Sequence, residues 1–162
     1  MTWHRTIAAF AFAVTISNSG CNDFGPGNSI PPDTFKQVTI TQGIWGNVWF
    51  WEGNFMPGSE NGTITPVERE IQVYEATRHD SVTFAGGSFY RDILTRLVAT
   101  TRSNRSGFYE VALPPGKYSL FVIEDSLYYA NPSDSASHIQ PGTVTENQIT
   151  KVQINIDYRA GY

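Results

Sequence analysis

The sequence predicts an all-β fold, an antiparallel Greek-key β-sandwich of seven strands. Short runs in which apolar and polar residues alternate are separated by stretches rich in glycine, proline and small polar residues. No stretch shows the 3.6-residue periodicity of an amphipathic helix. Seven short strands at this spacing are typical of two sheets packed face to face. The expected strands are residues 44–51, 67–77, 93–101, 108–113, 117–124, 127–130 and 149–158.

Length and composition fit a single globular domain. The chain has 162 residues, 40% of them hydrophobic, which is enough for a substantial core. Its formal net charge is −4 and it has no basic run, so we expect no nucleic-acid partner. The single cysteine, Cys21, excludes an intramolecular disulfide and a multi-cysteine metal site.

The first expected strand is unusually rich in tryptophan. If the even-numbered residues from 44 to 50 face the core, then Trp45, Trp49 and Trp51 project from the opposite face. Two interpretations stay open. An exposed row of indole rings would form a platform for a sugar or peptide ligand, or a protein contact. Alternatively, the segment before the strand, the loop after it, or outward residues such as Phe108 and Phe121 cover the row.

Residues 107–122 carry the most regular pattern in the chain. Apolar residues alternate up to Leu113, then Pro114, Pro115 and Gly116 interrupt the pattern, and alternation resumes at Tyr118. We expect a β-hairpin here, with Gly116 taking a positive φ in the turn. Two long connections, residues 54–66 and 79–92, have the length of functional or mobile loops.

The first 42 residues predict export and anchoring rather than core structure. Residues 1–20 contain a short apolar run that suits a secretory signal, and Asn18-Ser19-Gly20-Cys21 resembles a bacterial lipobox, although the usual leucine is Asn18. The resemblance implies cleavage before Cys21, acylation of its thiol and a location at the bacterial cell envelope, outer membrane included, on the periplasmic or surface side. Residues 21–42 have the composition of a flexible tether, which leaves residues 43–162 for the folded domain.

Several motifs together resemble the carboxypeptidase regulatory-like, or transthyretin-like (prealbumin-like), β-sandwich. They are Ile44-x-Gly46-x-Val48, Ile71-x-Val73, the turn and strands of residues 101–122 with Leu113-Pro114-Pro115-Gly116, and Val152-x-Ile154-x-Ile156. The resemblance implies the fold and a small stand-alone envelope lipoprotein. It therefore implies a non-catalytic binding or structural module, with a membrane attachment through the lipid and an envelope protein or a glycan as partner. A carbohydrate- or peptide-binding module that uses the tryptophan row is the alternative.

A hydrolase of the transthyretin-like type is a lesser alternative. Hydroxyisourate hydrolases end in Tyr-Arg-Gly-Ser, whereas this chain ends in Tyr158-Arg159-Ala160-Gly161-Tyr162 and lacks their amino-terminal histidine motif. We therefore expect no catalytic residues. The oligomeric state is not predicted by the sequence.

Three further groups of residues are candidate sites. Tyr128 and Tyr129 form a second aromatic pair, for which core packing and ligand binding both remain open. His79 and His138 lie in polar segments without the close, regular spacing of zinc ligands. Asp125, Ser133 and Asp134 lack the spacing of a calcium loop, so we expect no cofactor and no obligatory metal.

Overall fold

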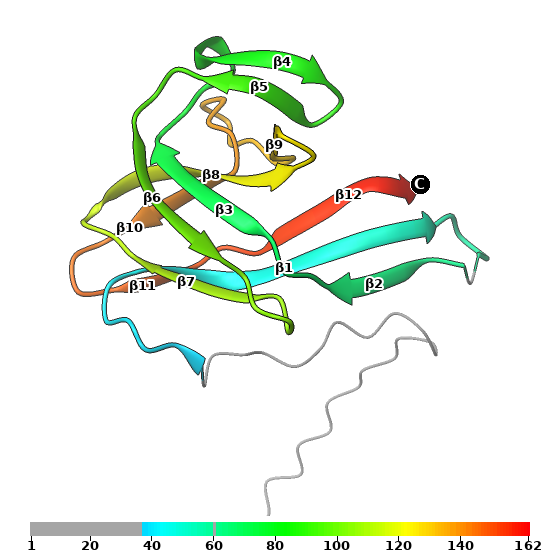
Figure 1. Ribbon diagram of the computed structural model, residues 1–162, viewed down its shortest axis with the longest axis horizontal. Helices are drawn as coiled ribbons and strands as arrows, with labels where there is room; N and C mark the ends of the chain where they lie inside the picture. Colours follow the sequence, from blue (N-terminus) through cyan, green and yellow to red (C-terminus); the bar gives the residue numbers. More distant parts are fainter. Residues whose placement is uncertain (1–36, 60) are drawn as a thin grey trace, which may run out of the picture.

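The computed structural model describes residues 37–59 and 61–162. This part of the chain is nearly all β-structure, with no α-helix, and forms two mostly antiparallel sheets packed as a sandwich (Figure 1). The predicted fold class is thus confirmed. The expected signal peptide, Cys21 and residues 22–36 of the expected tether lie outside the described residues. None of the described helices has the length and apolar character needed to cross a membrane.

The described residues contain twelve strands and one short 3-10 helix, η2 (His79–Ser81). The strands are β1 (Gly43–Asn54), β2 (Thr63–Pro66), β3 (Glu70–Glu75), β4 (Val82–Gly86), β5 (Phe89–Ile93), β6 (Leu97–Arg102), β7 (Phe108–Ala112), β8 (Gly116–Glu124), β9 (Leu127–Tyr129), β10 (Pro141–Val144), β11 (Ile149–Lys151) and β12 (Ile154–Gly161).

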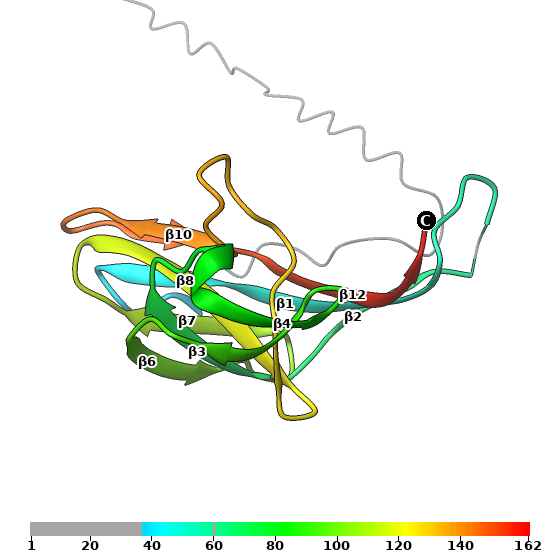
Figure 2. The same ribbon diagram turned by 90° about the horizontal axis from the view of Figure 1, so that it is seen from above.

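The smaller, five-stranded sheet is built around β1. On one side of β1, its first half pairs with β7 and its second half with β2, both antiparallel. On the other side, β11 and then β12 pair with it in parallel. Both views show β1, β2 and β12 extending past the larger sheet, toward the end that carries the C-terminus (Figures 1 and 2). One long strand therefore organises a whole layer of the sandwich.

The larger sheet has seven strands in the order β4-β5-β9-β8-β3-β6, and β10 also pairs with β8. One face packs against the smaller sheet and forms the main core, with buried residues such as Ile44, Val48, Ile71, Val73 and Leu120. Its other face carries a second cluster around Tyr74, Tyr90, Phe121 and Ile139. The central strands β3, β8 and β9 thus carry apolar residues on both faces.

The strand count exceeds the predicted seven because two expected loops and the last expected strand contain more structure than their patterns showed, and because β10 lies where no strand was expected. Residues 79–92 hold η2 and most of the β4–β5 hairpin, and residues 54–66 contain β2. The last expected strand divides into β11 and β12 at Val152, whose N–H donates to the Trp45 carbonyl at 2.8 Å. A Cβ on Gly46 would lie only 1.9 Å from the Val152 carbonyl oxygen, so glycine is required beside this break.

The hairpin expected at residues 107–122 is wrong. β7 pairs with β1 in the smaller sheet, whereas β8 pairs with β3, β9 and β10 in the larger one. The Leu113–Gly116 connection therefore crosses from one sheet to the other, and the apolar residues of both strands meet in the core from opposite sides. Period-two alternation is the same for both arrangements. Gly116 is also not among the glycines with positive φ, whereas Gly107, before β7, has φ 76°.

The last residues of the expected tether belong to the folded domain. The Thr39 N–H donates to the Glu110 carboxylate at 2.8 Å, and the Gln42 side chain donates to the Leu113 carbonyl at 2.9 Å. The Gln42 side-chain oxygen also accepts the Asn147 N–H at 2.7 Å. The domain boundary therefore lies before Thr39 rather than at residue 43.

Candidate functional site

Two of the three tryptophans expected on the outer face of β1 are covered. Trp45 is 4% exposed and Trp49 is 3% exposed. The Lys151 ammonium lies 5.0 Å from the ring centroid of Trp45, in cation–π geometry. Ile44 and Val48 point into the main core, as predicted, so this half of β1 is buried on both faces. Trp45 and Trp49 therefore offer no exposed platform.

The third tryptophan belongs to a partly exposed group at the protruding end of β1 and β12. The ring of half-buried Trp51 lies 5.1 Å from that of Phe55, which stacks on Tyr162 at 6.0 Å. Met56 is 49% exposed and Tyr162 is 69% exposed. We call these four residues, Trp51, Phe55, Met56 and Tyr162, the aromatic end.

Trp51 also carries an unusual polar group. Its Nε1–H is buried and has no hydrogen-bond partner. A buried donor without an acceptor costs about 1–3 kcal/mol, and such groups are rare in folded proteins. It is the one buried side-chain nitrogen or oxygen without a partner among the described residues. The aromatic end therefore contains a buried donor that no described residue satisfies.

Tyr129, one of the candidate ligand-binding residues, supports the edge of β12. Its hydroxyl donates to the Asp157 carboxylate at 2.6 Å, accepts the Asp157 N–H at 3.1 Å and lies 3.3 Å from the Asn155 carbonyl. Asn131 donates to the same carboxylate at 2.9 Å. Burial raises the pKa of Tyr129 well above 10, and the Asp157 carboxylate raises it further, whereas the Asp157 N–H lowers it. The hydroxyl therefore accepts a backbone N–H at the unpaired edge of β12, as the carbonyl of a neighbouring strand would.

Tyr128 packs on the opposite face of the larger sheet, in the second cluster. Its ring meets those of Tyr74 and Phe121 edge to face, with centroids 6.0 and 6.2 Å away. The Tyr74 hydroxyl lies 3.3 Å from the Tyr128 hydroxyl. Tyr128 and Tyr129 thus both make the packing contacts of structural residues. These contacts do not distinguish a ligand-binding role from the structural one.

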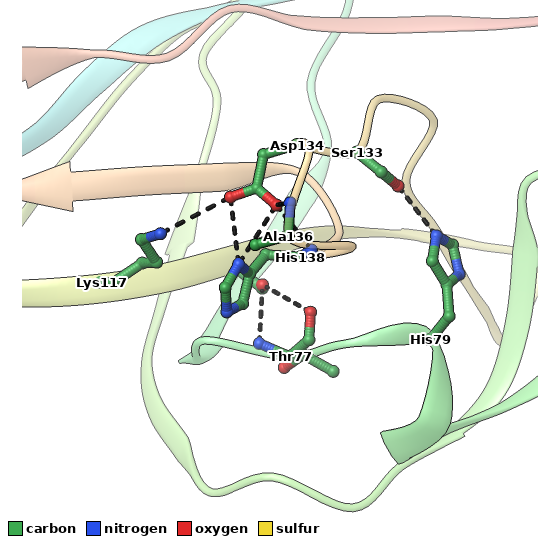
Figure 3. A network of polar contacts seen from close by, with 8 residues as sticks. Thr77, His79, Lys117, Ser133, Asp134, Ala136 and His138 are labelled. Atoms are coloured by element: carbon green, nitrogen blue, oxygen red, sulfur yellow. Dashed lines mark hydrogen bonds and ion pairs between the residues drawn. The ribbon is translucent and has the colours of Figure 1, made fainter.

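A polar network links the loop before β10 to β8 and η2 (Figure 3). Asp134 accepts the N–H groups of Ala136 and His138, both at 2.9 Å, and its carboxylate lies 3.0 Å from His138 Nδ1 and 3.5 Å from Lys117 Nζ. The backbone N–H of His138 is the largest cause that lowers the pKa of Asp134 to about 2, and the His138 side chain and the Ala136 N–H also lower it. These contacts of Asp134 hold the loop before β10 in one conformation.

The network contains serine, histidine and aspartate but does not form a catalytic triad. Ser133 Oγ contacts His79 Nε2 at 2.9 Å, whereas Asp134 contacts His138. Figure 3 shows the two histidines as separate pairs, so no single imidazole links a nucleophile to a carboxylate. Within residues 37–59 and 61–162, no group of three His, Cys, Asp or Glu side chains is placed to hold a metal ion. The sequence placed both histidines in polar segments but did not show these partners.

Sequence reasoning also missed Phe55 and Tyr162 as neighbours of Trp51. Phe55 follows the end of β1 and Tyr162 ends the chain, and only the parallel pairing of β1 with β12 brings them together. A parallel pair between strands about 100 positions apart leaves no local signal.

Comparison of the chain with models of protein families, with curated proteins and with solved structures finds no match. Function must therefore be inferred from the contacts described above.

Proposed function

We propose that this chain is a lipid-anchored β-sandwich of the bacterial cell envelope that acts as a non-catalytic binding or structural module. The observation that carries the proposal is that side chains capable of catalysis make structural contacts instead. Asp134 and His138 hold a loop, Tyr129 caps a strand edge, and the buried Glu124 pairs with Arg69. These contacts support a scaffold rather than a reaction centre.

The anchoring part of the proposal rests on the sequence. Cys21 follows an apolar segment and small residues that resemble a lipobox. Each buried methylene of an acyl chain adds about 0.8 kcal/mol of membrane affinity, so more than one chain on Cys21 would hold the protein permanently. The seventeen residues 22–38 would then separate the lipid-bearing Cys21 from Thr39, whose N–H is bonded to the sandwich.

Membrane fractionation of cells tests the anchor. The wild-type chain should sediment with membranes, and Cys21→Ser should move it to the soluble envelope fraction. Ser29→Ala, which changes the expected tether and keeps the lipobox intact, serves as the matched control and should stay with the membranes. A Cys21→Ser variant that remains in the membrane fraction would refute the lipid anchor.

We also propose that the domain is of the carboxypeptidase regulatory-like, transthyretin-like type. Support comes from the two-sheet sandwich and from the motifs at β1, β3, β7, β8 and β12. The fold hosts many functions, so this assignment carries no activity by itself.

The aromatic end favours a second candidate function, carbohydrate binding. Aromatic faces suit the apolar faces of sugar rings. Phe55, Met56 and Tyr162 are accessible enough to provide such a surface, and exposed Asn54 and Asn61 lie in the same turn region with polar groups for hydroxyls. This site replaces the Trp45–Trp49 part of the predicted row.

Binding to an array of envelope glycans tests the second candidate. Tyr162→Ala combined with Met56→Ala should lower retention on a binding glycan at least about tenfold, the loss expected when about 1.4 kcal/mol of contact energy is removed. Phe84→Ala is the control, because Phe84 is 64% exposed on β4, outside the aromatic end. Equal retention of all three proteins, or no retention of the wild type, would end the carbohydrate proposal.

A further inference from the structure

Three arginines gather around a hollow of about 380 Å³ between the end of β2 and the end of β6. Residues 66–69, Arg102 and Arg105 line it. The hollow shares no residue with the aromatic end, and an inference from it does not depend on the anchor or on carbohydrate binding. Its lining combines apolar Pro66 and Val67 with charged side chains.

Arg69 is fixed at one wall of the hollow. Its Nε donates to the Glu124 carboxylate, and its Nη1 donates to the Glu68 carbonyl at 3.0 Å. Glu124 is only 6% exposed and also accepts the Tyr158 hydroxyl at 3.0 Å. The Arg69 N–H donates to Ser103 Oγ at 2.8 Å, which ties its backbone to the segment after β6. The guanidinium is therefore positioned before any ligand arrives.

Arg102 and Arg105 are exposed and have no acidic partner among residues 37–59 and 61–162. Among the arginines that the structure describes, only these two and Arg91 make no ion pair, and two of the three line the same hollow. The turn that carries Arg105 is rigid, because Asn104 Oδ1 accepts the N–H groups of Ser106 at 2.9 Å and Phe108 at 3.1 Å. Their two positive charges remain uncompensated by any ion pair.

The acidic side chains near the hollow do not neutralise Arg102 and Arg105. Glu68 lines the hollow and makes no ion pair with these arginines. Glu70 stands opposite Arg102 in the β3–β6 register, but its carboxylate accepts the Gln72 amide at 3.0 Å. The whole chain carries a formal net charge of −4, so an anion bound here would be held by these arginines and not by a generally basic surface.

We propose that this hollow binds a tetrahedral oxyanion of the phosphate monoester class. Guanidinium groups match phosphate oxygens in paired hydrogen bonds, and a phosphate monoester carries about −1.5 to −2 charges near pH 7. That charge complements the two unpaired arginines, whereas a single carboxylate would leave one of them uncompensated. Arg69 supplies the fixed wall, and Arg102 and Arg105 close on the anion from the exposed side.

Calorimetric titration of the full chain with inorganic phosphate at low ionic strength tests the site. Arg102→Gln combined with Arg105→Gln should weaken binding at least about tenfold, or 1.4 kcal/mol. Arg91→Gln, which removes an unpaired arginine outside the hollow, should leave the affinity unchanged, and Glu68→Gln should raise it. No saturable phosphate binding by the wild type, or an equal loss in Arg91→Gln, would overturn the proposal.

A second titration distinguishes a lipid headgroup from a soluble phosphate ester. Vesicles of phosphatidylcholine with and without phosphatidic acid are compared for the wild type and the double arginine variant, so that any contribution of the N-terminal residues cancels. Retention that depends on phosphatidic acid and is lost in the variant identifies a lipid source. Phosphate binding without that dependence identifies a soluble source, and the site stands in both cases.

Discussion

Tyr128 and Tyr129 are neighbours in β9, yet their hydroxyl groups lie in different environments. Side chains alternate across a strand, so Tyr129 enters the main core beneath β12 while Tyr128 joins the cluster on the opposite face. The sequence predicted an aromatic pair that either packs in the core or binds a ligand, but it could not show which ring reaches β12. That contact depends on β9 and β12 facing each other across the sandwich.

Removing the Tyr129 hydroxyl should weaken the fold. Tyr129→Phe leaves the Asp157 N–H and carboxylate without their buried partner, and we expect the free energy of unfolding to fall by about 1–3 kcal/mol. Urea denaturation measures the change. Tyr128→Phe is the matched control and should cost less, because its hydroxyl makes only a 3.3 Å contact with Tyr74. Equal losses for the two variants would contradict the capping role.

The contacts of the Asp134 carboxylate predict that acid changes the conformation of its own loop and not of the rest of the domain. Its pKa falls from the ordinary 3.8 to about 2, so the ionised carboxylate stabilises the folded loop above about pH 4. That contribution is lost as the pH falls toward 2. Chemical shifts of the Ala136 and His138 amides should move over this range. In Asp134→Asn, the same amides should lack the transition, and a transition that persists there would refute the assignment.

At the scale of elements, local patterns predicted strands better than their partners. Residues 44–51, 108–113 and 117–124 are strands, because alternation and turn residues are properties of the local chain. The hairpin at residues 107–122 was wrong because alternation does not say whether the next strand joins the same sheet. The pattern left open whether Trp45 and Trp49 are exposed or covered, and the structure shows both buried, because this half of β1 is covered on both faces.

Glycine at the start of β7 should be essential to the packing of β7 against β1. Gly107 has φ 76°, and a Cβ there would lie 2.5 Å from the Val48 carbonyl oxygen, which is backbone and cannot move aside. Gly107→Ala should therefore lower the thermal midpoint by several degrees, which corresponds to a loss of about 1–3 kcal/mol.

Gly87→Ala separates this clash from the cost of positive φ. Gly87 has φ 58° in the β4–β5 turn, with nothing within 4 Å of the Cβ position. Gly87→Ala should therefore lower the free energy of unfolding only by the conformational cost of a positive φ, roughly 1 kcal/mol. A Gly107→Ala variant as stable as Gly87→Ala would show that β1 and β7 do not approach as closely as described.

For the whole molecule, composition and periodicity were sufficient to predict an all-β sandwich but not its surface. The fold class follows from many short alternating runs, each of which is a local feature. The aromatic end and the arginine hollow each combine residues from distant segments, such as Phe55 with Tyr162 and Arg69 with Arg105. Such groups appear only when the sheets are assembled, so sequence reasoning alone did not find them.

We propose that Cys21 anchors this sandwich at a membrane, and mass spectrometry of the mature protein tests that proposal most directly. The protein is isolated from membranes in detergent, and its N-terminal peptide is sequenced by fragmentation. We expect a peptide that begins at Cys21, lacks residues 1–20 and carries the added mass of acyl chains. A mature protein that begins elsewhere, or an unmodified Cys21, would contradict the account.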